Sequence, residues 1–349
     1  MSSFFIIFLV IISLCNFIIL YKAFPLAKFL KIIDFPNNEK KIHTKPTPLI
    51  GGLIFFINIF LFFLFEFLTQ FNSITNSEFF FNLRFISLKQ LITFLFVFIL
   101  IYIIGFYDDM YDVSPLKKTL LFLVFIYLLL ISNPNIPISR LQFYNFENNI
   151  YFNNFSIFLT LFCFLAFMNA SNMFDGLNLQ SSILYSSFLL IFYIKGIDHK
   201  FLLVFLLSLI FFSYMNLKEK SFLGNNGSYF LSFFIATIII SDHNWNKNYY
   251  VEEIFLYMML PGIDMIRLSI LRFLNNKSPF EGDNNHIHHL LMRKFNYRKT
   301  MIIIFLLIFS PILLFNLLKI NPLILIFFFL ALYIFILNIC SKIGIEKNS

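Results

Sequence analysis

Long apolar runs alternate with short polar segments along almost the whole chain. Eleven of the runs are predicted to be helices that cross a membrane, because a spanning helix needs roughly 17–25 mostly apolar residues. Backbone polar groups in lipid must be satisfied within the segment itself, so runs of this length are helices and not strands. The predicted spans are 3–22, 49–69, 88–107, 119–134, 153–170, 178–194, 201–216, 225–241, 251–270, 300–318 and 322–340.

Composition places the chain among integral membrane proteins. It has 349 residues, of which 59% are hydrophobic and 13% are charged. An average soluble domain carries about 25% charged and about 45–50% apolar residues, so this chain has too few polar groups to cover a water-soluble globule. A soluble enzyme, a disordered protein and a secreted disulfide scaffold are excluded. The predicted fold is an all-α polytopic membrane protein with ten or eleven transmembrane helices and a single domain, residues 1–349.

The positions of the positive charges favour one orientation in the bilayer. With the N-terminus outside, most of the 26 Lys and Arg residues fall in loops on the cytoplasmic side, and the opposite orientation would reverse this bias. The net charge of +8 is typical of such loops rather than of a surface that binds nucleic acid. We therefore expect the lipid bilayer, and no nucleic acid, as a partner.

Five polar clusters interrupt the apolar pattern, and this orientation places all of them on the cytoplasmic side. Carboxylates near the hydrocarbon boundary are costly unless they are paired or bound to metal, so we expect the clusters to form one site. Their conspicuous members are Lys45 within 34–52; Asp108, Asp109 and Asp112; Asn172, Asp175 and Gly176; Gly224, Asn225, Gly227 and Ser228; and Asp264, Arg267, Arg272, His286, His288 and His289.

The acidic clusters are candidate ligands for a divalent cation. Three like charges at Asp108, Asp109 and Asp112 repel one another unless a cation lies among them, and hard oxygen ligands suit Mg²⁺ or Mn²⁺. Asn172 and Asp175 are three residues apart, so on a continuing helix they share a face and could complete the same site. The alternative for 108–112 is a solvated loop with acids at a helix end.

The glycine-rich and histidine-rich clusters are candidate anion sites. Segment 224–228 opens a predicted helix, where flexible glycines expose amides and the dipole favours phosphate, although Gly-Asn turns are common for other reasons. The histidines of 286–289 could bind zinc, but no Cys or suitably spaced fourth ligand is nearby, so anion binding or orientation is favoured. The basic run 28–45 could instead anchor anionic lipid.

Together, the clusters indicate a cytoplasm-facing pocket with a divalent cation and diphosphate-binding groups, beside a wall of lipid-facing helices. Such a pocket suits phosphoryl transfer from a soluble nucleotide donor to a lipid acceptor. The main alternative is a transporter in which the acids couple to an ion. Transporters place their binding residues near the bilayer midplane, often in repeated halves, and this sequence has no detectable repeat.

From Asp34 to His289 the five motifs resemble, in their order and topology, those of the bacterial polyprenyl-phosphate N-acetylhexosamine-1-phosphate transferases. This group is glycosyltransferase family 4, related to phospho-N-acetylmuramoyl-pentapeptide transferase. The resemblance implies transfer of a sugar 1-phosphate from a UDP-N-acetylhexosamine, by default UDP-GlcNAc, to undecaprenyl phosphate. UMP would be released and a cell-surface glycan begun. It further implies the bacterial inner membrane, an active site facing the cytoplasm, Mg²⁺ with Mn²⁺ as a substitute, and a homodimer as a candidate assembly.

The resemblance also implies roles for particular residues. Asp108, Asp109 and Asp112 match the catalytic acids, and Asp108 is expected nearest the attacking lipid phosphate. The expected metal ligands are Asp109, Asp175 and Asn225. The expected nucleotide-sugar contacts are Lys45, Asn172, Asp175, Gly176, Arg267, Arg272, His286, His288 and His289. The expected phosphate cradle comprises Gly224, Gly227 and Ser228.

Two positions depart from the family's pattern, and each lacks an expected carboxylate. Asn225 stands where the Gly-Asp-x-Gly-Ser motif has its Asp. Leu177-Asn178-Leu179 follows Gly176, where the family usually continues with an acidic residue and another Gly. An Asn carbonyl can still ligate a hard cation, but the site loses negative charge. An inactive relative that acts as a membrane scaffold is therefore a second alternative; the retained acids and histidines favour an active protein.

Overall fold

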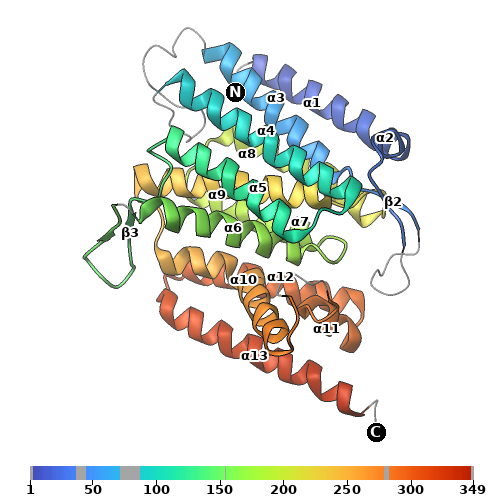
Figure 1. The fold of residues 1–349 in the computed structure, drawn as a ribbon, viewed down its shortest axis with the longest axis vertical. Helices are drawn as coiled ribbons and strands as arrows, with labels where there is room; N and C mark the ends of the chain where they lie inside the picture. The colour runs from blue at the N-terminus through green and yellow to red at the C-terminus, as the bar shows by residue number, and fades with distance from the viewer. Residues whose placement is uncertain (1–2, 37–44, 71–86, 154, 279–282, 347–349) are drawn as a thin grey trace.

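The structure is a computed structural model that describes residues 3–36, 45–70, 87–153, 155–278 and 283–346. Nearly all regular structure in these residues is helical (Figure 1). The helices are α1 (Ser3–Tyr21), α2 (Ala23–Leu30), α3 (Gly51–Gln70), α4 (Leu88–Tyr111), α5 (Pro115–Ser132), α6 (Ser156–Phe174), α7 (Gln180–Ile194), α8 (His199–Leu217), α9 (Gly224–Asn246), α10 (Val251–Leu274), α11 (Ile287–Lys294), α12 (Tyr297–Asn316) and α13 (Pro322–Glu346). Two antiparallel strand pairs accompany them: β1 (Ile33–Asp34) with β2 (Thr47–Pro48), and β3 (Arg140–Leu141) with β4 (Ile150–Tyr151).

Each of the eleven predicted spans coincides with a helix. Within the described residues, nine helices are long and apolar enough to cross a membrane: α1, α3, α4, α5, α6, α8, α10, α12 and α13. Of the other two, α7 is apolar but has only 15 residues, and α9 begins with a polar turn. The prediction of an all-α polytopic membrane protein is confirmed. Passage of α7 and α9 through the whole bilayer stays a prediction.

Local sequence explains where several helices begin. The Ser87 side chain accepts a hydrogen bond from the Gln90 amide at the start of α4, and the Asn296 side chain does the same for the Lys299 amide at the start of α12. Pro115 is the first residue of α5, a position where its missing N–H costs nothing. These residues cap helix ends whose first amides have no partner within the helix.

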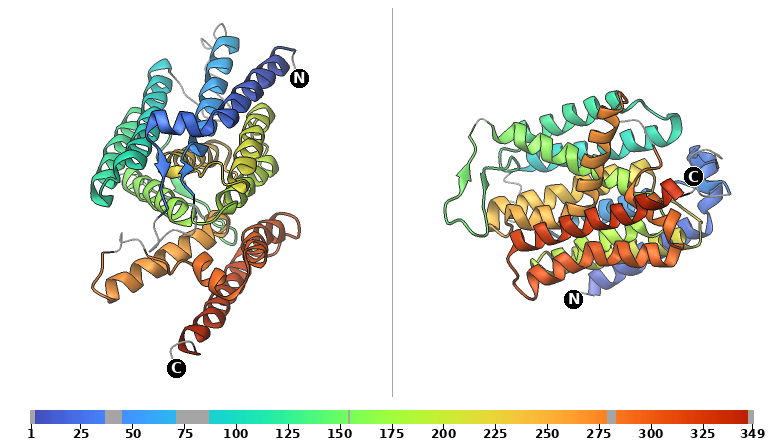
Figure 2. Two further views of the ribbon diagram at one scale, coloured as in Figure 1. Left: turned by 90° about the vertical axis from the view of Figure 1, so that its right-hand side faces the viewer. Right: turned by 90° about the horizontal axis from the view of Figure 1, so that it is seen from below.

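Helix α9 lies at the centre of the bundle and packs against α3, α4 and α6 (Figures 1 and 2). Every residue from Asn226 to His243 is buried. Much of its packing is aromatic: the Phe230 ring meets Phe98 of α4 edge to face, with 4.6 Å between ring centres. A helix that is apolar on all sides is expected at such a position, and its start is therefore held firmly by its neighbours.

Small residues allow the start of α9 to approach α3 and α4 very closely. A Cβ atom on Gly52 of α3 would lie 1.9 Å from Asn226 Oδ1 and 2.4 Å from the backbone of Gly227. A Cβ on Gly105 of α4 would lie 2.6 Å from the Asn226 backbone. Because backbone atoms cannot yield as flexible side chains do, glycine is required where these three helices cross.

Two features differ from the prediction. Helices α4 and α6 continue to Tyr111 and Phe174, past the predicted span ends at 107 and 170, so Asp109 and Asn172 lie on helices rather than in loops. The short helices α2 and α11 were not predicted, because eight-residue amphipathic segments contain no long apolar run.

Candidate active site

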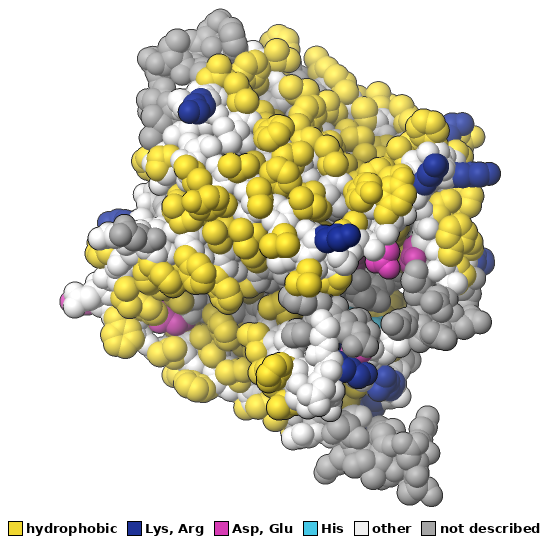
Figure 3. Space-filling model, in the orientation of Figure 1, with side chains coloured by type: hydrophobic (Ala, Val, Ile, Leu, Met, Phe, Trp, Pro, Cys, Tyr) yellow, Lys and Arg dark blue, Asp and Glu magenta, His cyan; other side chains and the backbone are white. Residues whose placement is uncertain are grey.

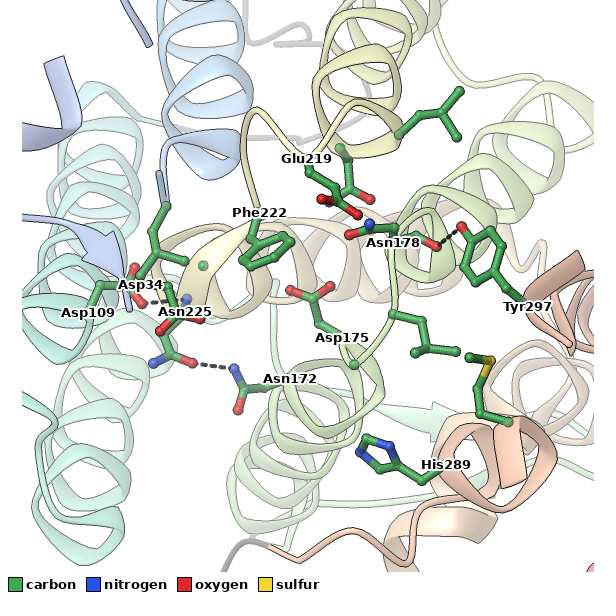
Figure 4. A pocket seen from close by; sticks show the side chains of 17 residues that line it. Asp34, Asp109, Asn172, Asp175, Asn178, Glu219, Phe222, Asn225, His289 and Tyr297 are labelled. Carbon is green, nitrogen blue, oxygen red and sulfur yellow. Dashed lines mark hydrogen bonds between the residues drawn. The ribbon is translucent and has the colours of Figure 1, made fainter. Parts of the chain in front are cut away.

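A cavity of about 680 Å³ opens at the end of the bundle where α4, α6 and α8 finish and α7 and α9 begin (Figure 4). Its polar lining comprises Asp34, Asp109, Asn172, Asp175, Asn178, Asn216, Glu219, Asn225, His289 and Tyr297. Four of these side chains are carboxylic acids, and the described lining residues include no Lys or Arg. The cavity is therefore strongly acidic and suits a cation or a ligand that carries one.

Asp109, in the last turn of α4, is fixed by the start of α9. Its two carboxylate oxygens accept hydrogen bonds from the Asn225 amide at 2.8 Å and the Asn226 amide at 3.0 Å. Gly224 precedes these amides with φ +79°, and a Cβ there would lie 2.8 Å from Asp109 Oδ2. The positive end of the α9 dipole stabilises the carboxylate charge, and each oxygen retains a lone pair.

The start of α9 contacts neighbouring helices at the residues expected to form a phosphate cradle, and that role stays a prediction. The amides that would bind the anion already face Asp109. Gly227 packs against Gly52, and Ser228 bonds to Asn172. The glycines of this motif therefore serve a close turn and a helix crossing, while Gly224 and Asn225 still line the cavity.

Asp175 follows the last residue of α6 and faces the cavity (Figure 4). Its carboxylate accepts a short hydrogen bond from the Ser181 hydroxyl. Desolvation raises the pKa of Asp175 to about 6, against the lowering effect of the Ser181 hydrogen bond. None of the ion pairs in the described residues involves Asp175 or Asp109, so negative charge here is costly without a bound cation.

Asn172 links α6 to α9 beside the two acids. Its Nδ2 donates to Asn225 Oδ1 and to Ser228 Oγ, each at 2.7 Å, and its Oδ1 accepts from the Tyr229 hydroxyl at 3.2 Å. These bonds define which way both amides point. The Asn225 oxygen faces Asn172, as the dashed line in Figure 4 shows, and keeps one lone pair for a further ligand.

Asp108 and Asp112 do not line the cavity, and the catalytic roles expected for them stay predictions. Asp108 is 2% exposed and bonds to the Val113 amide at 2.9 Å and to Lys118 Nζ at 2.8 Å. Asp112 is exposed and ends α4 in the left-handed conformation, with φ 50°. Adjacent residues of a helix point in different directions, so Asp109 alone of this cluster faces the cavity.

The three histidines lie close together, but only His289 lines the cavity. His288 is buried against Gly176, where a Cβ would lie 2.0 Å from its Nε2, and its Nδ1 is 3.2 Å from Gln180 Nε2. Burial lowers the pKa of His289, and it holds that of His288 well below the ordinary value. Both rings therefore favour the neutral form at pH 7, in which each can still donate one hydrogen bond, and the nucleotide-sugar contacts expected of them stay predictions.

The predicted basic contacts also lie outside the cavity lining. Arg267 bonds to Asp264, and Arg272 bonds to Asp283 at 2.8 Å. Lys45 is exposed and precedes β2. Residues 37–44 of the first motif lie outside the described residues.

Ten lining residues had not been predicted as site residues, and the polar or aromatic ones among them are Asp34, Asn178, Asn216, Glu219, Phe222 and Tyr297. Asp34 opens the first polar cluster and is placed at the cavity because β1 pairs with β2. Asn216 accepts a hydrogen bond from the Leu179 amide, and Tyr297 donates one to the Asn178 carbonyl. The others are isolated polar or aromatic residues at helix ends, which no sequence pattern distinguishes.

The fold and the cavity define a multi-pass membrane protein with an acidic cavity at one end of its helix bundle. A family model described as glycosyl transferase family 4 matches residues 91–243. Relatives named undecaprenyl-phosphate alpha-N-acetylglucosaminyl 1-phosphate transferase occur in Salmonella typhi, at 25% identity over 85% of this chain and 79% of the relative, and in Thermotoga maritima, at 25% identity over 88% and 87%. A relative of the same name in Yersinia pestis is 26% identical over 85% of this chain and 79% of its own. The chain is thus similar to glycosyl transferase family 4 over residues 91–243, and to these relatives over most of its length.

Proposed function

We propose that the protein transfers N-acetylhexosamine 1-phosphate from a UDP-sugar, UDP-GlcNAc by default, to undecaprenyl phosphate, releasing UMP. The observation that carries this proposal is the acidic cavity at one end of an apolar helix bundle. Such a site gives a charged, soluble donor access to a lipid acceptor. The names of the relatives support the same reaction, and the family model spans α4 to α9, which supply most of the cavity's lining.

The donor set of the cavity fits Mg²⁺, with Mn²⁺ as a substitute. Asp109, Asp175 and Asn225 would hold the ion through hard oxygen atoms. The described residues contain no group of three or more His, Cys, Asp and Glu side chains arranged to hold a metal, so water and the donor's phosphates would complete the shell, as is usual for Mg²⁺. When bound, the ion would offset the charge that develops on the donor diphosphate.

The chain's own residues would chiefly orient the reactants. Asp109 is fixed by two backbone amides before any ligand arrives, and Asn172 fixes the amide of Asn225. The acceptor phosphate has a second pKa near 6, so most of it is a dianion at pH 7. It can attack in line without a strong base. An acceptor oxygen bonds to the phosphorus attached to the sugar as the bond from that phosphorus to the UMP oxygen breaks.

We also propose that the N-terminus lies outside a bacterial inner membrane and that the cavity faces the cytoplasm, where the reaction begins a cell-surface glycan. Most of the Lys and Arg side chains visible in Figure 3 lie toward the end of the bundle that carries α2 and α11, beside a broad hydrophobic surface. The cytoplasmic side is where the positive-inside rule places such charges. It is also the side where a soluble nucleotide donor is available.

Transfer of label from UDP-GlcNAc, carrying carbon-14 in the sugar, into butanol-extractable lipid tests the reaction. Membranes with the protein, undecaprenyl phosphate and Mg²⁺ should form labelled lipid, and membranes with Asp175→Asn should not. If no labelled lipid forms with UDP-GlcNAc, other UDP-N-acetylhexosamines are tested in the same assay. Absence of labelled lipid with all of them would contradict the proposal and favour an inactive scaffold. Movement of solute without lipid product would favour a transporter.

A further inference from the structure

A buried network around Asp264 fixes the start of α11. Asp264, on α10, is 2% exposed. Its Oδ1 accepts hydrogen bonds from Arg267 Nη2 at 2.7 Å and from the Tyr333 hydroxyl of α13 at 2.8 Å. Its Oδ2 is 3.1 Å from His286 Nδ1, and both oxygens face the Ile287 amide, at 3.2 and 3.3 Å. The carboxylate thus caps α11 and ties its first residues to α10 and α13.

Arg267 closes this network instead of reaching the cavity. Its Nε donates to the Tyr333 hydroxyl at 2.9 Å, and its Nη2 donates to the Asn285 carbonyl at 2.6 Å as well as to Asp264. One guanidinium therefore binds a carboxylate, a hydroxyl and a backbone carbonyl from three segments. The fixed fork of an arginine suits this arrangement, whereas the point charge of a lysine does not.

The network is connected to the cavity through the histidine rings. His286 stacks on His288, with 5.3 Å between ring centres and 9° between planes. His288 lies against Gly176, and His289, 4.3 Å away, lines the cavity. A shift at the start of α11 would therefore move both the His288 ring, which touches Gly176, and the His289 ring, which lines the cavity.

We propose that Asp264, Arg267 and Tyr333 are positioning residues that hold α11 in register, so that His289 and the buried His288 shape the donor side of the cavity. This inference rests on the proposed function and goes beyond it, because it gives Arg267 an indirect role and adds a residue from the last helix. A direct phosphate contact by Arg267 would require the guanidinium to leave three partners.

Tyr333→Phe tests the proposal, with Tyr257→Phe as the matched control. Both tyrosines are 3% exposed, and each hydroxyl bonds to a buried carboxylate of α10: Asp264 for Tyr333, and Glu253, at the other end of the helix, for Tyr257. Tyr333→Phe should raise KM for UDP-GlcNAc about tenfold, with little change in KM for undecaprenyl phosphate. Tyr257→Phe should change neither KM.

Hydrogen–deuterium exchange supplies a readout that needs no activity. Peptides covering 285–291 should exchange faster in Tyr333→Phe than in the wild type, because the amide of Ile287 loses a rigid acceptor, and should be unchanged in Tyr257→Phe. Equal KM values in the two variants, or unchanged exchange in Tyr333→Phe, would overturn the proposal. If the wild-type protein forms no labelled lipid, the proposed function fails. The exchange comparison alone then decides whether the Asp264 network fixes the start of α11.

Arg267→Lys separates positioning from direct phosphate binding. A lysine keeps the charge but cannot bond to three partners at once. If Arg267 is a positioning residue, Arg267→Lys should exchange faster at 285–291. Its KM for the donor should rise about tenfold above that of the wild type. A lysine variant with unchanged exchange at 285–291 and an unchanged KM for the donor would contradict the proposal.

Discussion

The two acids that line the cavity should respond differently to the same substitution. Asp109 accepts hydrogen bonds from two backbone amides of α9, one on each oxygen. Asp175 accepts one from the Ser181 hydroxyl. Both variants, Asp109→Asn and Asp175→Asn, remove a proposed metal ligand and should abolish transfer. Only the first removes a structural contact as well.

The structure sets the size of this difference. An asparagine at 109 presents one oxygen, so one α9 amide loses its acceptor and faces an NH₂ group. A buried hydrogen bond to a charged group contributes about 1.5–3 kcal/mol, and the lost charge at the helix start adds up to about 1 kcal/mol. We therefore expect Asp109→Asn to lower the free energy of unfolding by about 2–4 kcal/mol.

At position 175 the Ser181 hydroxyl can donate to the amide oxygen instead. A carboxyl whose pKa is raised in the folded protein, here to about 6, destabilises the fold at higher pH, because ionisation is easier in the unfolded chain. At pH 7 the neutral Asp175→Asn side chain should therefore leave stability unchanged or raise it.

Thermal unfolding of detergent-purified protein, measured beside the lipid-transfer assay, checks both expectations. Asp109→Asn should unfold about 3–5 °C below the wild type, and Asp175→Asn should unfold at the wild-type temperature or above it. The reasoning is refuted if Asp109→Asn keeps the wild-type midpoint, or if the two variants lose stability equally.

Three further substitutions test other parts of the site. Gly176→Ala would place a Cβ 2.0 Å from the buried His288 ring; kcat/KM for the UDP-sugar should fall at least about tenfold, and normal kinetics would show that the ring is free to move. Lys118→Met leaves the buried Asp108 without its ion-pair partner and should cost about 3–5 kcal/mol of stability, read as a lowered unfolding midpoint; an unchanged midpoint would argue against the pair. Asn225→Asp adds a carboxylate to the cavity, so the Mg²⁺ concentration for half-maximal transfer should fall about tenfold; an unchanged Mg²⁺ titration would exclude this residue from the metal's surroundings.

The helices could be predicted from sequence because long apolar runs in lipid leave the backbone one structure to adopt. Their ends were harder to predict. Helices α4 and α6 extend past the apolar runs because partners on other helices satisfy their polar last turns, as the α9 amides do for Asp109 and as Asn225 does for Asn172. Such partners are distant in sequence and appear only once the helices are packed.

The site could be predicted as a set of segments but not as a set of side chains. Asp109, Asp175 and Asn172 line one cavity because their motifs occur at helix ends that meet, while the roles expected for them stay predictions. The choice between Asp108 and its neighbour depends on the rotation of α4 about its axis, which the motif does not reveal. Likewise, Arg267 bonds to a tyrosine 66 residues later in the chain, within a helix that contains no motif.

Asn225, which stands where the family's motif has an aspartate, is compatible with an active site. A carboxylate oxygen and an amide oxygen accept the Asn172 hydrogen bond equally well, so the link between α6 and α9 survives the change. The described lining still contains four acids and no Lys or Arg. The proposed cation would therefore still meet an acidic lining that can bind it through oxygen atoms. Asp175 is a buried acid that lowers stability when it is ionised, and a scaffold without catalytic activity would gain nothing from it. The cavity therefore favours phosphoryl transfer over a purely structural role.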